Sequence, residues 1–169
     1  NDELYFGNYP FEPAFVFKNK RIGASQIEAI YFSTFPISLK IGEDLIFVST
    51  AQEDELKAFA IKNQIPMLDR KRNWNGLTEP FLDAEYSIAE QEKTLEQLQI
   101  IGFTQAEVEQ IRQEIEKPLT KYNNVFWEEY FLGLYDVLLA MRPIYNQKQF
   151  NDFYWKAIEI EQRNKVVLK

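Results

Sequence analysis

The stretch Val125–Met141, VFWEEYFLGLYDVLLAM, is apolar on almost every side. A helix that is hydrophobic all round is usually buried in a protein core. We therefore predict a central core helix here, with Asn124 as its N-cap and Pro143 just beyond its end. The stretch is too short, and too interrupted by acids, to span a membrane.

The first 68 residues alternate between short apolar runs and turn signals, a pattern typical of a small antiparallel sheet. Residues 1–13 are expected to form an irregular arm, and Lys18–Arg21 a basic turn. The expected strands are Phe15–Phe17, Gln26–Ser33, Ile37–Ile41 and Leu45–Ser49, with Ile65–Leu68 as an edge strand. Thr50 and Glu53 form a capping box that predicts a helix over Ala51–Asn63.

The second half of the chain shows helical spacing. Ser87 with Glu90 and Thr104 with Glu107 form two further capping boxes. They predict a helix to about Ile101 and a second one to about Glu116, limited by Pro118, which together make an αα-hairpin turning at Gly102. Apolar residues at helical spacing predict a C-terminal helix over Gln147–Arg163.

These elements predict an α+β fold, with a mostly antiparallel N-terminal sheet and one helix followed by a helical half. We expect a single domain over 1–169, with a sheet half at about 1–68 and a helical half at about 77–165. The polar, basic segment Asp69–Gly76 is expected to be an exposed loop between the halves. Trp74 within it would either fold back onto the core or remain exposed as an anchor for a base or a protein.

The composition excludes several kinds of chemistry. The chain of 169 residues has no Cys and no His. Ser-His-Asp and Cys-His catalysis and ordinary zinc sites are therefore excluded, and we expect no cofactor and no transition metal. The absence of cysteine and of a signal peptide or long apolar run favours a cytoplasmic protein.

The negative charge is concentrated in one window. The net charge is −7, and Glu79–Glu116 holds ten acidic and two basic residues, which leaves eight net negative charges there. This distribution disfavours binding to nucleic acid or an anionic membrane and favours a basic protein partner, although a solvated surface is the alternative explanation. The acids predicted to bind the partner are Glu79, Asp83, Glu85, Glu92, Glu96, Glu107, Glu109, Glu114 and Glu116.

Two other groups of residues offer alternatives. Glu129, Gly133 and Asp136 would share one face of the core helix. This face is either a narrow solvent-exposed strip on an otherwise buried helix, or the site of a carboxylate pair, Glu129 and Asp136, for acid–base or cation chemistry. The pair would be separated by about 10.5 Å along the helix, too far to share one proton. Acids near Glu79 beside the bases Arg70–Arg72 could form a small-ligand site or simply local ion pairs.

The acidic run EPFLDAEYSIAEQEKTLEQL, together with the aromatic core helix, resembles the small acidic immunity proteins of bacterial toxin–immunity pairs. This resemblance implies a cytoplasmic inhibitor that masks the active site of a basic toxin, often a nuclease. The alternatives are an enzyme or small-ligand-binding domain that uses carboxylates without histidine, or a structural adaptor.

Overall fold

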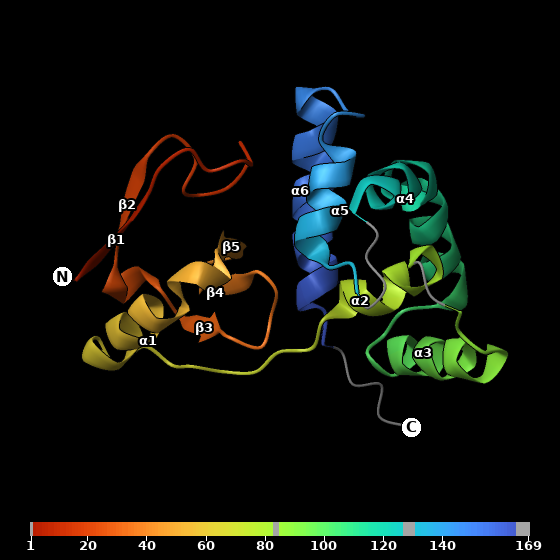
Figure 1. Cartoon of the computed structure of the whole chain (residues 1–169), viewed down its shortest axis with the longest axis horizontal. Helices are drawn as coiled ribbons and strands as arrows, with labels where there is room; N and C mark the ends of the chain where they lie inside the picture. Colours follow the sequence, from red (N-terminus) through yellow and green to blue (C-terminus); the bar gives the residue numbers. More distant parts are fainter. Residues whose placement is uncertain (1, 83–84, 127–130, 165–169) are drawn as a thin grey trace. The chain divides into compact units, whose positions relative to one another are not determined.

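The computed structural model describes residues 2–82, 85–126 and 131–164 and has an α+β fold, with strands first and helices after them (Figure 1). The chain divides into two compact units, Asn1–Arg70 and Lys71–Lys169. The division falls inside the segment predicted as the boundary, residues 69–76. That the two halves form a single domain stays a prediction.

A three-stranded antiparallel sheet forms the centre of the first unit. It consists of β3 (Ala29–Tyr31), β4 (Ile37–Ile41) and β5 (Asp44–Val48), with β4 in the middle. Every residue of β5 is buried, which fits the apolar run that predicted it. Met67 adds a single parallel bridge to Ile30 in β3, so the expected edge strand is reduced to one pairing.

The N-terminal arm differs from the expectation. Residues predicted to be irregular form β1 (Glu3–Phe6), which pairs antiparallel with β2 (Lys20–Gly23). The strand predicted at Phe15–Phe17 is wrong, because these residues lie in turns. Lys18 and Asn19 adopt left-handed conformations, with φ of 65° and 61°, and this reversal leads the chain into β2.

Side chains and backbone of the arm cover the open edge of β5. The backbone N–H of Phe47 donates to the Tyr9 hydroxyl at 2.9 Å, and the N–H of Phe15 donates to Asp44 Oδ2 at 2.9 Å. The first bond satisfies a backbone N–H that an uncovered edge strand would present to other chains, and the second holds the arm beside β5.

The helix after the sheet begins differently from the prediction. A short 3-10 turn, η2 (Thr50–Gln52), is capped by Ser49, whose hydroxyl accepts from the N–H of Ala51 at 3.3 Å. It leads directly into α1 (Glu53–Lys62), so Thr50 is not the N-cap. The earlier start follows from Ser49, which offers a hydroxyl at the end of the strand.

The second unit is helical. In chain order it contains α2 (Asn73–Thr78), the 3-10 turn η3 (Glu79–Phe81), α3 (Ile88–Ile100), α4 (Gln105–Phe126), α5 (Leu134–Met141) and α6 (Gln147–Gln162). The two helices predicted to form the αα-hairpin are present as α3 and α4, joined by the turn at Gly102, but they run at a steep angle and do not pack along each other (Figure 1). The C-terminal helix is present as α6.

The short helix α2 packs against α3, α4 and α6 and is the centre of this unit. It begins at Asn73, inside the segment predicted to be an exposed loop, so that prediction is wrong for its second half. Trp74 is fully buried, which confirms the alternative in which it folds onto the core. Its indole N–H donates to the carbonyl of Ala157 in α6 at 2.9 Å.

The helix expected to stop near Glu116 continues through Pro118 to Phe126. An interior proline removes one helix hydrogen bond and crowds the preceding turn, at a cost of about 3 kcal/mol. Tertiary contacts beyond Pro118 offset this cost. Leu119 is fully buried, and the Tyr122 hydroxyl donates to Asp136 at 3.0 Å.

The prediction of a single core helix over Val125–Met141 is wrong. Asn124 lies inside α4 rather than at an N-cap, residues 127–130 lie outside the described part, and α5 begins only at Leu134. Gly133 is extended, and its N–H donates to Asp136 Oδ2 at 2.9 Å. The carbonyl of Leu132 bonds to the Thr78 hydroxyl at 2.6 Å instead of a helical N–H, so the backbone leaves the helical path here.

Candidate functional site

The α3–α4 hairpin holds most of the predicted partner-binding acids, and its two ends are fixed by local hydrogen bonds. Ser87 caps α3, because its N–H donates to Glu90 Oε2 at 2.8 Å and its hydroxyl accepts from the N–H of Glu90 at 3.3 Å. The Ser87 hydroxyl also donates to Glu90 Oε2 at 2.6 Å, and this bond, followed by the one from the Ser87 N–H, lowers the pKa of Glu90. The predicted capping box is therefore confirmed, and α3 begins at a defined residue.

The turn of the hairpin has the geometry of a Schellman motif. Gly102 has a φ of 100°, its N–H donates to the carbonyl of Gln99, and the N–H of Phe103 donates to that of Leu98 at 3.0 Å. Phe103 and Leu98 are both buried. The second predicted capping box follows at once, with the N–H of Glu107 donating to Thr104 Oγ1 at 3.1 Å.

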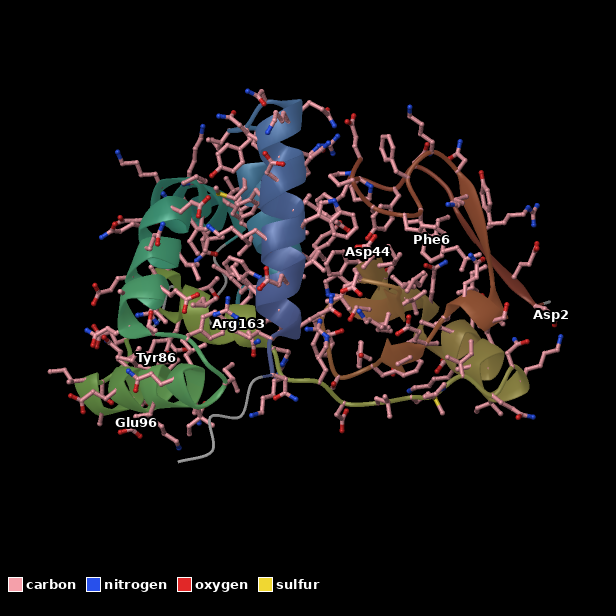
Figure 2. All side chains as sticks on the ribbon, turned by 180° about the vertical axis from the view of Figure 1, so that it is seen from behind. Asp2, Phe6, Asp44, Tyr86, Glu96 and Arg163 are labelled. Atoms are coloured by element: carbon pink, nitrogen blue, oxygen red, sulfur yellow. The ribbon has the colours of Figure 1, made fainter. Side chains whose placement is uncertain are left out.

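Two acids of α4 are engaged by cations that are distant in sequence. Arg163, just beyond α6, donates to Glu107 at 3.0 Å and stacks over Phe103 at 4.1 Å. A hydrogen bond from the Thr104 N–H and the Arg163 guanidinium lower the pKa of Glu107. Figure 2 shows Arg163 at the end of α6.

Glu114 is the second engaged acid. Its carboxylate accepts from the Tyr145 hydroxyl at 2.9 Å and from Lys156 Nζ at 2.7 Å. Burial, followed by the hydrogen bond to Glu114, raises the pKa of Tyr145 to about 12. Glu107 and Glu114 therefore hold the hairpin to the C-terminal segment, and their charges are partly neutralised within the chain.

Glu79 does not belong to an exposed surface, because only 7% of it is accessible. Arg112 lies within its electrostatic influence and donates to the carbonyls of Leu77 and Gly76, each at 3.1 Å. This acid is removed from the predicted docking surface because it is buried. Asp83 lies outside the described residues.

The remaining predicted acids are all exposed. We name this set the acidic face: Glu85, Glu92, Glu96, Glu109 and Glu116. Figure 2 shows Glu96 on α3, on the side away from α4. Each helix of the hairpin contributes two of these carboxylates, and Glu85 precedes α3 in the chain. Of the nine predicted acids, five are thus exposed, Glu79 is buried, Glu107 and Glu114 are paired within the unit, and Asp83 is not described.

The alternative carboxylate pair is not supported by the backbone. Glu129 lies outside the described residues, and Asp136 does not share an unbroken helix with it because residues 131–133 are not helical. Burial raises the pKa of Asp136, while the hydrogen bonds from Gly133 and Tyr122 oppose that shift. Asp136 is the third residue of α5: its carboxylate accepts from the N–H of Gly133, the N-cap residue, and links α5 to α4 through Tyr122.

The small-ligand site considered for the acids near Glu79 and the bases Arg70–Arg72 stays a hypothesis, because Asp83 lies outside the described residues. Arg70 belongs to the first unit and donates to Ser38 at 3.3 Å, while the guanidinium of Arg72 lies 5.8 Å from the ring centre of Phe131. Within the ranges 2–82, 85–126 and 131–164, no group of three or more acidic side chains is arranged to hold a metal ion.

Two exposed apolar side chains on α3 were not predicted from the sequence. Ile88 is 76% exposed and Ile100 is 52% exposed. Helical spacing could have identified Ile100, which lies off the side of Leu95 and Leu98. Ile88 lies seven residues before Leu95, on the same side, so only the structure shows that it is exposed.

No helix among the described residues combines the length and the apolar character needed to cross a bilayer. Comparison with known proteins gives no family model, no curated protein and no solved structure that matches this chain.

Proposed function

We propose that the chain binds a basic protein through the acidic face of the α3–α4 hairpin and inhibits that protein, as the resemblance to immunity proteins implies. The observation that carries this proposal is the exposure of Glu92 and Glu96 on α3 and of Glu109 and Glu116 on α4, two helices joined by one short turn. Clustered exposed carboxylates attract a cationic surface and accelerate its association. Such an inhibitor would act in the cytoplasm of a bacterial cell.

The fixed geometry of the hairpin supports this role. Both capping boxes and the Schellman turn order the backbone without help from a partner. The backbone that carries the acids is therefore ordered before binding, so little backbone entropy is lost when the partner docks.

A paired set of charge reversals tests the proposal. The partner is captured from cells of the source organism on the immobilised chain, and its association rate is measured with the double variant Glu92→Lys/Glu96→Lys. The matched control is Glu12→Lys/Glu55→Lys, which changes the net charge equally at exposed positions of the first unit. Glu107 and Glu114 are left unchanged because their reversal would break ion pairs within the unit.

We expect the hairpin variant to slow association about tenfold or more, and the rate for the unaltered chain to fall as salt rises. The captured protein should also lose its own activity in the complex. Equal rates for the two double variants, or an association rate independent of salt, would refute the acidic face as the docking surface.

A further inference from the structure

We propose that β1 pairs with β1 of a second copy of the chain. The two strands would run antiparallel and join two of the two-stranded sheets into one sheet of four strands. The contact is made by backbone groups along the outer edge of β1. This inference concerns the first unit and goes beyond the proposed function, because it does not involve the acidic face.

The hydrogen bonds between β1 and β2 determine which backbone groups of β1 point outward. The N–H of Ala24 donates to the carbonyl of Asp2 at 2.8 Å, so these two residues form a directly bonded pair just beyond the strands. Bonded pairs fall at every second residue of an antiparallel ladder. Leu4 therefore points its N–H and C=O toward β2, whereas Glu3 and Tyr5 point theirs away from it.

The two outer edges of this sheet differ. On the outer edge of β2, the N–H of Gly23 donates to Gln26 Oε1 at 3.0 Å, so a side chain of the same chain already occupies that position. On the outer edge of β1, no hydrogen bond from residues 2–82, 85–126 or 131–164 reaches the outward groups of Glu3 and Tyr5. An edge with unpaired N–H and C=O groups is a template for another strand.

The side chains show that β1 is less covered by the unit than β2. Leu4 and Ile22 are opposite each other and so lie on the same side of the sheet. Ile22 is fully buried, whereas Leu4 is only half-buried. On the other side of the sheet, Tyr5 is 60% exposed. A strand added next to β1 would therefore cover apolar surface of Leu4 that its own chain leaves accessible.

The outward groups favour one register between the two copies. If Leu4 lies on the two-fold axis, Glu3 of each copy is opposite Tyr5 of the other, and each of these pairs exchanges two hydrogen bonds. The two Leu4 side chains then meet at the axis. A shift by two residues would either set Glu3 against Glu3, which repel each other, or leave Tyr5 against Tyr5 as the only bonded pair within the strands.

The charges also fit a second copy in this register. Arg21 of β2 is opposite Tyr5, and its guanidinium lies 5.6 Å from the centre of the tyrosine ring. Glu3 of the second copy would lie on the other side of the same ring. Each carboxylate would thus approach a tyrosine and a guanidinium of the other copy, while its ion pair with Arg21 of its own chain is long, at 3.7 Å.

The contact is small, because β1 has four residues. Interfaces that bury less than about 1,000 Å² are weak or transient. We therefore expect a dimer that forms as the concentration rises.

Cross-linking tests the register directly, because the chain has no cysteine of its own. In the variant Leu4→Cys, the two thiols would meet at the axis with their Cα atoms about 4.5 Å apart, which is within the range of a disulfide. The matched control is Phe6→Cys, on the same side of β1, where the two positions lie about 14 Å apart along the strands. Formation of the linked dimer in a glutathione buffer is followed on non-reducing gels.

We expect Leu4→Cys to cross-link at least about tenfold faster than Phe6→Cys. Adding Glu3→Pro should remove this advantage, because proline has no N–H to donate to the second copy, although the outward side of an edge strand tolerates it. Adding Glu3→Ala keeps the N–H and should retain the advantage. Circular dichroism checks that each variant is folded. Equal rates for the two cysteine variants, no linked dimer, or no effect of Glu3→Pro would overturn the inference.

Sedimentation velocity of the unaltered chain separates this inference from the proposed function. The sedimentation coefficient should rise with concentration, and Glu3→Pro should prevent the rise, whereas Glu92→Lys/Glu96→Lys should leave it unchanged. A coefficient that does not depend on concentration would contradict the dimer without affecting the acidic face. If Glu3→Pro reduces capture of a partner and Leu4→Cys gives no linked dimer, the edge of β1 binds a strand of that partner, and the inference is wrong.

Discussion

Glu161 accepts a hydrogen bond from the backbone N–H of Trp74 at 2.9 Å, so a carboxylate near the end of α6 caps the first turn of α2. The reverse contact is also present. Asn73 Nδ2 donates to the carbonyls of Ile160 and Arg163, each at 2.8 Å, and so satisfies the last turn of α6. Residues nearly 90 positions apart thus complete each other's helix ends, and this is why the chain turns helical at Asn73 and does not continue as a loop to Gly76.

Replacing Asn73 by alanine should destabilise the protein by about 1–3 kcal/mol, because it leaves buried carbonyls of α6 without their donor. Chemical denaturation measures the effect. Asn75→Ala, a half-buried position in the same helix, is the control and should cost about 0.5 kcal/mol or less. Equal losses for the two variants would show that the cap on α6 does not stabilise the unit.

Pro118→Ala should raise the free energy of unfolding by about 1–2 kcal/mol. Alanine restores the missing helix hydrogen bond inside α4, and this gain exceeds the smaller entropic benefit of proline in the unfolded chain. A loss of stability would instead mean that α4 needs the distortion at Pro118 to bring Tyr122 to Asp136.

Leu138→Ala should cost about 2–5 kcal/mol, because Leu138 is fully buried in α5 and its truncation leaves a cavity. Leu139→Ala, at the neighbouring half-buried position, is the comparison and should cost clearly less. An unchanged denaturation midpoint for Leu138→Ala would remove α5 from the core.

Glu107 should make stability depend on pH. Its pKa lies below the ordinary value of 4.5, because the Thr104 N–H and Arg163 favour the charged form. A lowered folded-state pKa stabilises the protein above pH 4.5, and this contribution disappears as the pH falls through the folded-state value. The advantage in melting temperature of the wild type over Glu107→Gln should therefore be present at pH 7 and shrink below pH 4.5.

The same comparison with Glu116→Gln provides the control, because this substitution removes an exposed carboxylate from the same helix. A wild-type advantage over Glu107→Gln that does not change between pH 7 and acid would contradict the assigned hydrogen bonds.

The sequence by itself determined those elements whose hydrogen-bonding residues lie within a few positions of one another. The capping boxes at Ser87 and Thr104 and the left-handed Gly102 were readable because their donors and acceptors are at most five residues apart. The α+β order of the chain and the buried strand β5 followed from apolar periodicity in the same way. The concentration of acids in the hairpin also required no structure.

Tertiary structure decided the features that depend on distant partners. The sequence could not show that Leu132 would bond to Thr78, which ends the predicted core helix, or that contacts of Leu119 and Tyr122 would carry α4 past Pro118. It also could not distinguish Glu107 and Glu114, which pair with Arg163 and Lys156, from the exposed Glu109 and Glu116. The physical reason is that charge and hydrophobicity are properties of single residues, whereas burial and pairing arise only when the chain brings distant segments together.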